Sequence, residues 1–192
     1  MEECALLHGC STGNTKITRG HKLPAKFILH TVGPRCYNTI TKLPVEKLQR
    51  CYTSCLSHVP KHKLKSVAFC CISTGIFSYP NEAAAFTALL TIRDWLTKSD
   101  NYKRIDRVIL CVFEEKDLKI YEQMMQVFFP PVRHSKNVQL PCYSADKWSK
   151  IKKFVKKNTI DNVDELCVSR SSFVQPMEQS LTNRAAEIYP RV

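Results

Sequence analysis

The sequence predicts an α/β fold built on a largely parallel sheet with helices on both faces. Short apolar runs alternate along the chain with longer segments of helical periodicity, which is the order of βαβ units. Residues typical of turns, such as glycine and proline, follow the apolar runs. The hydrophobic fraction of 44% is sufficient for a core. Such folds bind ligands beyond the carboxyl ends of their strands, so the loops after Ile72 and Val112 are the expected site.

A helix end and two strands are expected first. Residues 1–10 have the pattern of a helix end, with Gly9 as its C-terminal stop. Residues 16–20 are polar and predict an edge strand. Residues 26–32 form a continuous apolar run that a glycine and a proline end, which predicts a buried strand.

Two helices and another strand follow. Residues 44–62 have an apolar face at helical spacing, and residues 66–73 predict a second buried strand. Asn81 is expected to cap a helix over residues 82–98. The residues expected on the buried faces are Leu48, Cys51, Cys55, Leu56 and Val59 in the first helix and Ala84, Ala85, Ala88, Ile92, Trp95 and Leu96 in the second.

One more strand and helix complete the predicted domain. Residues 107–113 are a third apolar run that predicts a buried strand, and Asp117 precedes the last helix. Two prolines at positions 130 and 131 end that helix, because proline cannot continue it. The residues expected on its buried face are Leu118, Tyr121, Met125 and Phe128.

The domain organisation follows from a change in amino-acid composition after residue 129. Residues 1–129 are predicted to form one domain, and residues 130–192 a basic extension that is partly helical or disordered. The net charge of +12 keeps a protein soluble, and it also favours phosphate-rich partners. Residues 146–157 combine lysines with an apolar stripe, which fits either a solvated helix or a contact with nucleic acid or anionic lipid.

The ten cysteines are expected to be reduced. No secretory signal opens the chain, and several cysteines lie in apolar runs, where they act as small buried hydrophobic residues. We therefore expect a cytoplasmic or nuclear location. No Cys-x-x-Cys pair occurs, no apolar run is long enough to span a membrane, and nothing in the sequence requires a metal or an organic cofactor.

The segment 72–80, Ile-Ser-Thr-Gly-Ile-Phe-Ser-Tyr-Pro, contains the most informative residues. It joins a predicted strand to a predicted helix, and glycine permits the backbone angles of a concave turn whose N–H groups hold phosphate. Phe77 and Tyr79 are expected either to wall a sugar or base or to pack under the turn. From the residues alone, an ordinary strand-to-helix turn is favoured over a phosphate loop.

This loop resembles the second ligand-binding loop of macrodomains, and its flanks resemble the same family in order. The similarity runs from residue 1 to about residue 129 and is closest to the MacroD-type branch. It implies a three-layer α/β/α fold with a mixed, mostly parallel sheet. The matching segments are Glu3 to Thr18, Leu23 to Pro34, Cys51 and Tyr52, Ser66 to Phe69, Asn81 to Ala84, Trp95 and Leu96, and Val108 to Phe113.

The resemblance implies roles for individual residues toward ADP-ribose. The ring of Phe77 would lie against the distal ribose. Phe113 would border the adenine, unless it is a core aromatic that closes the strand. Glycine is usual in the family at the position of Ser78, so we expect this side chain to narrow the ribose end and slow turnover. The residues whose backbone would wrap the diphosphate are Ser73, Thr74, Gly75, Ile76 and Phe77.

The family's N-terminal motifs do not occur in this sequence. They are a Gly-Asp-Ile strand, an Asn-Ala-Ala-Asn strand end, and a glycine-rich loop followed by aspartate, and the family assigns that asparagine and aspartate to the ribose and the catalytic water. By resemblance, the missing strand lies between those at 26–32 and 66–73. We therefore expect a truncated macrodomain in which these two strands pair directly or leave interior edges unpaired, with low stability or aggregation. A gene model, a splice product or a fragment would each explain such a chain.

No catalytic residue is assigned from the sequence. His30, in a predicted strand, is either a general base or a satisfied core histidine. His58 and His62 have metal-ligand spacing, but Pro60 is expected to interrupt their helix. Cys70 and Cys71 are too apolar in context to be activated nucleophiles.

Three functions are therefore open. The first is hydrolysis that removes mono-ADP-ribose from proteins or deacetylates O-acetyl-ADP-ribose, which we expect to be impaired in this chain. The second is a non-catalytic reader of ADP-ribose or of mono-ADP-ribosylated proteins. The third is a basic protein that associates with nucleic acid through residues 130–192.

Overall fold

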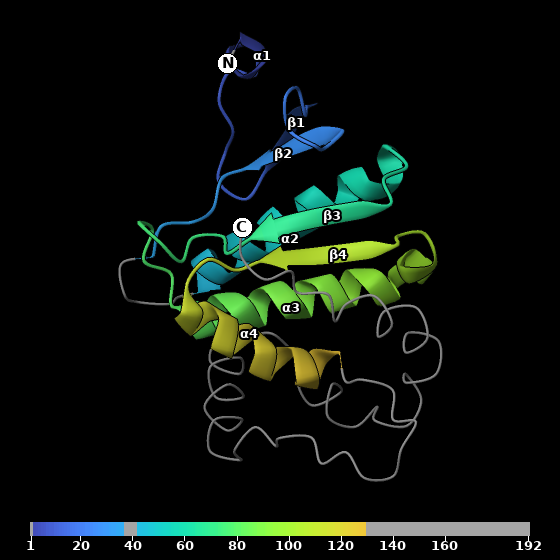
Figure 1. Cartoon of the computed structure of the whole chain (residues 1–192). Helices are drawn as coiled ribbons and strands as arrows, with labels where there is room; N and C mark the ends of the chain where they lie inside the picture. The colour runs from blue at the N-terminus through green and yellow to red at the C-terminus, as the bar shows by residue number, and fades with distance from the viewer. Residues whose placement is uncertain (1, 37–41, 130–192) are drawn as a thin grey trace.

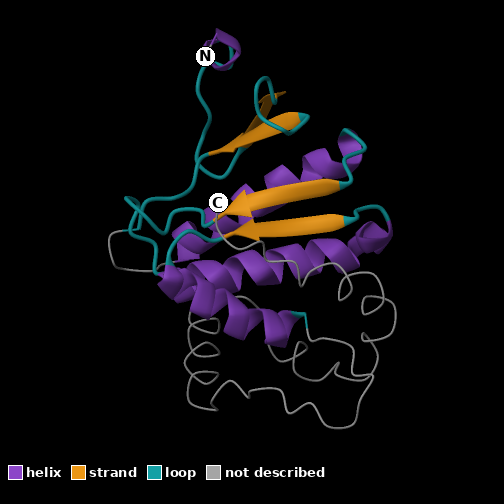
Figure 2. Cartoon of the chain, viewed as in Figure 1, coloured by secondary structure: helices purple, strands orange, loops and turns teal. Residues whose placement is uncertain are grey.

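The computed structural model describes residues 2–36 and 42–129. Strands and helices alternate through this part of the chain (Figure 1; Figure 2). The basic extension at 130–192, with the helix expected over residues 146–157, lies outside the described residues. No helix among those described has the length and hydrophobicity needed to cross a bilayer.

The N-terminal elements are a one-turn helix and an antiparallel strand pair. Helix α1 spans Glu2–Ala5, and strands β1 (Thr15–Arg19) and β2 (Phe27–Thr31) pair antiparallel. All five residues of β2 are only half-buried, so the prediction of a buried strand at 26–32 is wrong. The cause is the position of the pair, which stands apart from the other strands and makes few contacts with the helices (Figure 1).

A second, parallel strand pair lies at the centre of the structure. Strand β3 spans Ser66–Cys70 and β4 spans Arg107–Cys111, with Cys70 and Cys111 as register partners. The carboxyl ends of both strands therefore meet at one edge. In the described residues β2 and β3 do not pair, so of the two expected arrangements the direct pairing of these strands is wrong.

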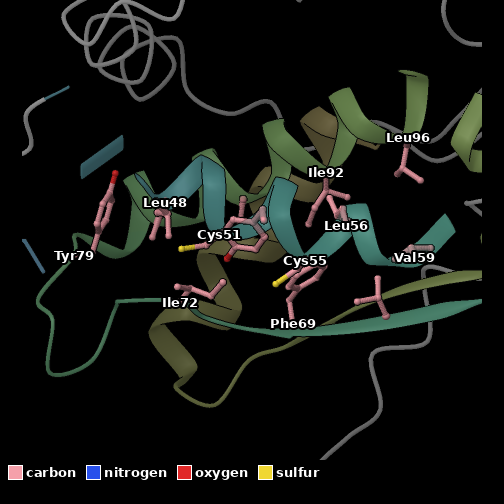
Figure 3. Packing of buried hydrophobic residues seen from close by; sticks show 14 of the residues in the cluster. Leu48, Cys51, Cys55, Leu56, Val59, Phe69, Ile72, Tyr79, Ile92 and Leu96 are labelled. Carbon is pink, nitrogen blue, oxygen red and sulfur yellow. The ribbon is translucent and has the colours of Figure 1, made fainter. Parts of the chain in front are cut away.

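Three helices lie on one face of this parallel pair. Helix α2 spans Lys42–Lys61, α3 spans Asn81–Thr97 and α4 spans Glu115–Phe128, with a short 3₁₀ segment at Lys98–Lys103 after α3. All five residues predicted on the apolar face of α2 are buried, and Figure 3 shows them packed with residues of β3 and α3. Proline 60 lies in the last turn of α2, so it does not interrupt the helix.

The parallel pair buries only one of its faces against the described helices. Val67 and Phe69 of β3 are buried in the core, whereas Ala68 and Cys70 are exposed. The prediction of a fully buried strand at 66–73 is therefore wrong, because a strand buried on one face alternates. Strand β4, which was also predicted to be buried, is half-buried as well. The described residues therefore make one helical layer and one sheet layer.

The starts of α3 and α4 differ from the sequence prediction. Pro80 occupies the N-cap of α3 and makes no side-chain cap hydrogen bond. Asn81 is instead the first helical residue, and its side-chain amide donates to the Asp117 carboxylate at 2.5 Å. Asp117 lies inside α4, after the N-cap residue Glu114, and is only 4% exposed. A tertiary contact between two helix starts therefore replaces the predicted cap.

Candidate ligand-binding site at the carboxyl ends of the parallel strands

The loop between β3 and α3 is closed by two hydrogen bonds of its own. The Ser78 N–H donates to the Gly75 carbonyl at 2.8 Å, and the Tyr79 N–H donates to the Ser73 carbonyl at 2.9 Å. The Thr74 hydroxyl donates to the Cys71 carbonyl at 3.3 Å and holds the start of the loop to the end of the strand. These bonds define a compact turn over residues 73–79.

Four successive main-chain donors of this loop are unused. Among the described residues, the N–H groups of Thr74, Gly75, Ile76 and Phe77 donate to no other group. Gly75 is exposed, and Ile76 is 98% exposed. Successive unpaired N–H groups in a turn attract anions, and the N-terminus of α3, which begins at residue 81, adds its partial positive charge.

The backbone of the loop turns at its serines. Ser73 has φ of 70° and Ser78 has φ of 52°, both in the left-handed region. Gly75 does not have positive φ, so the expectation that glycine supplies the special backbone angles here is wrong. A Cβ added to Gly75 would meet no atom within 4 Å, so glycine instead leaves open space in front of the donors.

Replacing Ser78 with glycine is expected to stabilise the domain by about 1 kcal/mol. The left-handed conformation costs a residue with a Cβ about 1–2 kcal/mol, and the greater freedom of glycine in the unfolded chain offsets part of that gain. Urea denaturation measures the change. Ser78→Ala keeps the strained angle and is the matched control, so equal stability of the two variants would contradict this explanation.

A second segment, residues 33–36, lies against the loop. The Cys36 N–H donates to the Phe77 carbonyl at 2.8 Å, and the Arg35 guanidinium lies 5.2 Å from the centre of the Phe77 ring. A Cβ on Gly33 would overlap the Ser73 hydroxyl and approach Ile72 Cγ2 at 2.8 Å. The absence of a side chain at Gly33 therefore allows the two segments to touch.

Arg35 was not among the site residues predicted from the sequence. It is exposed, and its stacking on Phe77 places a cation beside the four unused donors. The signal that points to it is its position just after the Gly33-Pro34 pair that follows β2. The side chains that follow such strand ends gather at the site edge in α/β folds.

The two aromatic residues of the loop have different environments. Tyr79 is 1% exposed and packs into the core on the side of Leu48, near the start of α2 (Figure 3), and burial raises the pKa of its hydroxyl to about 12. It therefore packs under the turn and does not wall a ligand. Phe77 is half-buried, and one face of its ring is covered by Arg35.

Phe113 lies beyond the end of β4 and is 99% exposed. The alternative that it is a core aromatic is therefore wrong. Because Cys70 and Cys111 are register partners in a parallel pair, Phe113 emerges at the same edge as the 73–79 loop. An exposed phenyl ring beside an anion-binding turn suits a ligand that joins a planar ring to phosphate.

Other titratable side chains considered from the sequence lie in β2, in α2 and directly after β3. His30 is a half-buried member of β2 whose Nε2 pairs with the Thr18 hydroxyl at 2.8 Å, as a satisfied histidine does. His58 and His62 stack with their ring centres 5.5 Å apart. Burial and the neighbouring Asp117 raise the pKa of the Cys71 thiol to about 12, which opposes a role as a nucleophile.

The chain matches the model of the Macro domain family over residues 1–88. ADP-ribose glycohydrolase MACROD2 of Mus musculus is 52% identical over 130 residues, which are 68% of this chain and 27% of the relative. The Protein-ADP-ribose hydrolase of Staphylococcus aureus (strain MSSA476) is 45% identical, over 58% of this chain and 41% of the relative. The chain spans less than half the length of these curated relatives.

Solved structures give the same assignment. A mutant macrodomain of Oceanobacillus iheyensis is 36% identical with a TM-score of 0.59, over 65% of this chain and 68% of that one. The Trypanosoma brucei macrodomain in complex with ADP-ribose is 37% identical with a TM-score of 0.58, over 64% of this chain and 50% of that one. With these likenesses in both sequence and α/β architecture, this chain belongs to the macrodomain family.

Proposed function

We propose that this chain binds ADP-ribose at the carboxyl ends of β3 and β4. The observation that carries the proposal is the run of four N–H groups over residues 74–77, which donate to nothing in the described part of the chain and suit the diphosphate. The Arg35 guanidinium beside this run adds a positive charge. The Trypanosoma brucei macrodomain, 37% identical, was solved with ADP-ribose, and the curated relatives are named for ADP-ribose.

The orientation of the ligand follows from the aromatic residues. The adenine would stack on Phe113, whose ring is solvent-exposed and lies at the same edge as the loop. The distal ribose would lie against Phe77, with Ser78 at the end of the turn. Backbone groups from Ser73 to Phe77 would enclose the diphosphate between them. The two ends of ADP-ribose are thereby recognised by different loops.

Replacing Phe113 with alanine is expected to weaken ADP-ribose binding about tenfold, without lowering the melting temperature. A base stacked on an aromatic ring is worth about 1–3 kcal/mol, whereas a ring that is 99% exposed adds nothing to the core. Titration calorimetry measures the affinity. Phe113→Tyr retains the stacking face and is expected to bind like the original chain. Full affinity in Phe113→Ala would place the adenine elsewhere.

Hydrolysis is the activity in the names of the curated relatives, and we propose it for the whole protein. The groups that this chain contributes at the loop are backbone donors and aromatic rings, which hold a ligand but do not accept a proton. We therefore expect this chain to bind ADP-ribose but to hydrolyse ADP-ribose conjugates slowly. Release of ADP-ribose from a carboxyl-modified protein and release of acetate from O-acetyl-ADP-ribose test the two reactions.

The first experiment is titration calorimetry of the full chain with ADP-ribose, beside a thermal melt. Binding to ADP-ribose with a raised melting temperature supports the proposal, and adenosine alone, which lacks the diphosphate, is the matched negative control. A folded chain that ignores ADP-ribose would refute it. The nucleic-acid alternative predicts instead binding to duplex DNA that falls steeply with added salt.

A cytoplasmic or nuclear location remains a proposal that the cysteines support. The eight cysteines in the described part of the chain are thiols rather than disulfides. Persistent thiols are typical of reducing compartments. Fractionation of cells that express the tagged chain tests the location, and recovery from the secretory pathway would refute it.

A further inference from the structure

Two exposed thiols lie side by side at the edge of the sheet that leads into the binding loops. Cys70 is the last residue of β3 and Cys111 the last residue of β4. Both are exposed thiols, and they are register partners in the parallel pair. They therefore occupy neighbouring positions on the same face of the sheet, opposite the helices.

The spacing of the two cysteines suits a disulfide. Neighbouring strands lie roughly 4.7–4.9 Å apart, and side chains of register partners project from the same face. Disulfides join residues whose Cα atoms are about 4.4–6.8 Å apart. The backbone of β3 and β4 therefore already holds Cys70 and Cys111 within bridging range.

The remaining described cysteines lack this combination of exposure and a neighbouring thiol. Cys71 faces the helical side, where burial and Asp117 raise the pKa of its thiol to about 12. Cys4 is exposed but lies in α1, with its sulfur 4.0 Å from His30 Nε2. The cysteines that are buried or half-buried are Cys10, Cys36, Cys51, Cys55 and Cys71.

We propose that Cys70 and Cys111 form a dithiol site that is oxidised to a reversible intramolecular disulfide by a low-molecular-weight disulfide such as oxidised glutathione. The thiolate of one cysteine attacks the glutathione disulfide, forms a mixed disulfide and releases one glutathione thiol. The second cysteine then attacks the protein sulfur and releases the other glutathione. In total the two protein thiols lose two electrons and two protons, and one oxidised glutathione becomes two reduced molecules.

The position of the bridge gives it a structural consequence. It would join the ends of the two strands from which the 73–79 loop and Phe113 emerge. Exposed disulfides are the ones that reducing agents open readily, so the bridge is suited to reversible modification and not to permanent stabilisation. The proposal concerns the thiols alone and does not depend on ADP-ribose binding.

The test uses the full chain with Cys142 and Cys167 replaced by serine, so that cysteines beyond residue 129 cannot compete. The reduced protein is incubated with oxidised glutathione in mildly alkaline buffer, because the thiolate is the attacking species. Remaining thiols are alkylated and peptides are mapped by mass spectrometry. We expect a Cys70–Cys111 link in most molecules, lost on treatment with dithiothreitol.

Matched variants identify the partners. Cys111→Ser is expected to keep glutathione on Cys70, because the resolving thiol is gone. Cys71→Ala and Cys4→Ser are expected to form the link as before. Stable glutathione on both Cys70 and Cys111, a link to Cys71, or links formed only between isotopically distinguished chains would each overturn the proposal.

Discussion

Gly75→Glu is expected to weaken ADP-ribose binding by roughly 100-fold or more while the domain stays folded. A Cβ at this position meets no atom within 4 Å, so the longer side chain can be accommodated without disturbing the loop. Its carboxylate would stand among the four unused N–H donors, where it occupies them and repels the diphosphate. Like charges placed together at an interface cost several kcal/mol, and about 2.7 kcal/mol corresponds to a 100-fold change.

Gly75→Ala is the control for this experiment. The open space and the ordinary backbone angle both permit a methyl group, so alanine should retain most of the affinity. Titration calorimetry of both variants separates the effect of the added charge on affinity from the effect of the added side-chain volume. Circular dichroism checks that both variants are folded. Equal affinity of the glutamate variant and the original chain would show that the ligand does not use this loop.

Gly33→Ala is expected to lower the free energy of unfolding by about 1–3 kcal/mol and to weaken ADP-ribose binding as well. The added methyl group would overlap the Ser73 hydroxyl and press on Ile72, both at the start of the binding loop. Overpacking of this kind costs about 1–3 kcal/mol, because neighbouring atoms must shift. The loop would then move away from the 33–36 segment, and the contact of Arg35 with Phe77 would loosen.

A double variant tests the cause of that loss. Ser73 has positive φ, and its buried hydroxyl has no hydrogen-bond partner among the described residues. Gly33→Ala combined with Ser73→Gly removes the overlapping hydroxyl and should recover part of the stability. Chemical denaturation of the four proteins gives the coupling energy. Strictly additive changes would mean that the two residues do not collide.

Helix α2 shows how much of the fold is predictable from local sequence. Its apolar stripe at spacings of three and four predicted five buried positions, and all five are buried, because a helix turns every 3.6 residues whatever surrounds it. Val45 and Tyr52 of the same helix are buried as well. The strands were placed correctly along the chain, but their burial was not. An apolar run predicts a strand equally well whether one face or both are covered, and coverage depends on distant segments.

The same division holds for the binding site. The residues alone favoured an ordinary turn at 72–80 over a phosphate loop, and only the resemblance to macrodomains assigned residues 73–77 to the diphosphate and Phe113 to the adenine. The position of Arg35 just after a strand points to the site, but no sequence pattern places it against Phe77: 42 positions separate the two residues, and only the packing of two segments joins them. Likewise, the left-handed angles at Ser73 and Ser78 result from how the loop closes.

The type and order of the helices and strands, and the likeness to macrodomains, are readable in the amino-acid sequence. Those properties follow from short-range periodicity and from residues read one after another. The pairing of β3 with β4, which sets Cys70 beside Cys111, and the separate pairing of β1 with β2 become visible only in the folded chain. Strand pairing is a contact between distant residues, so its register is set by how whole elements pack together.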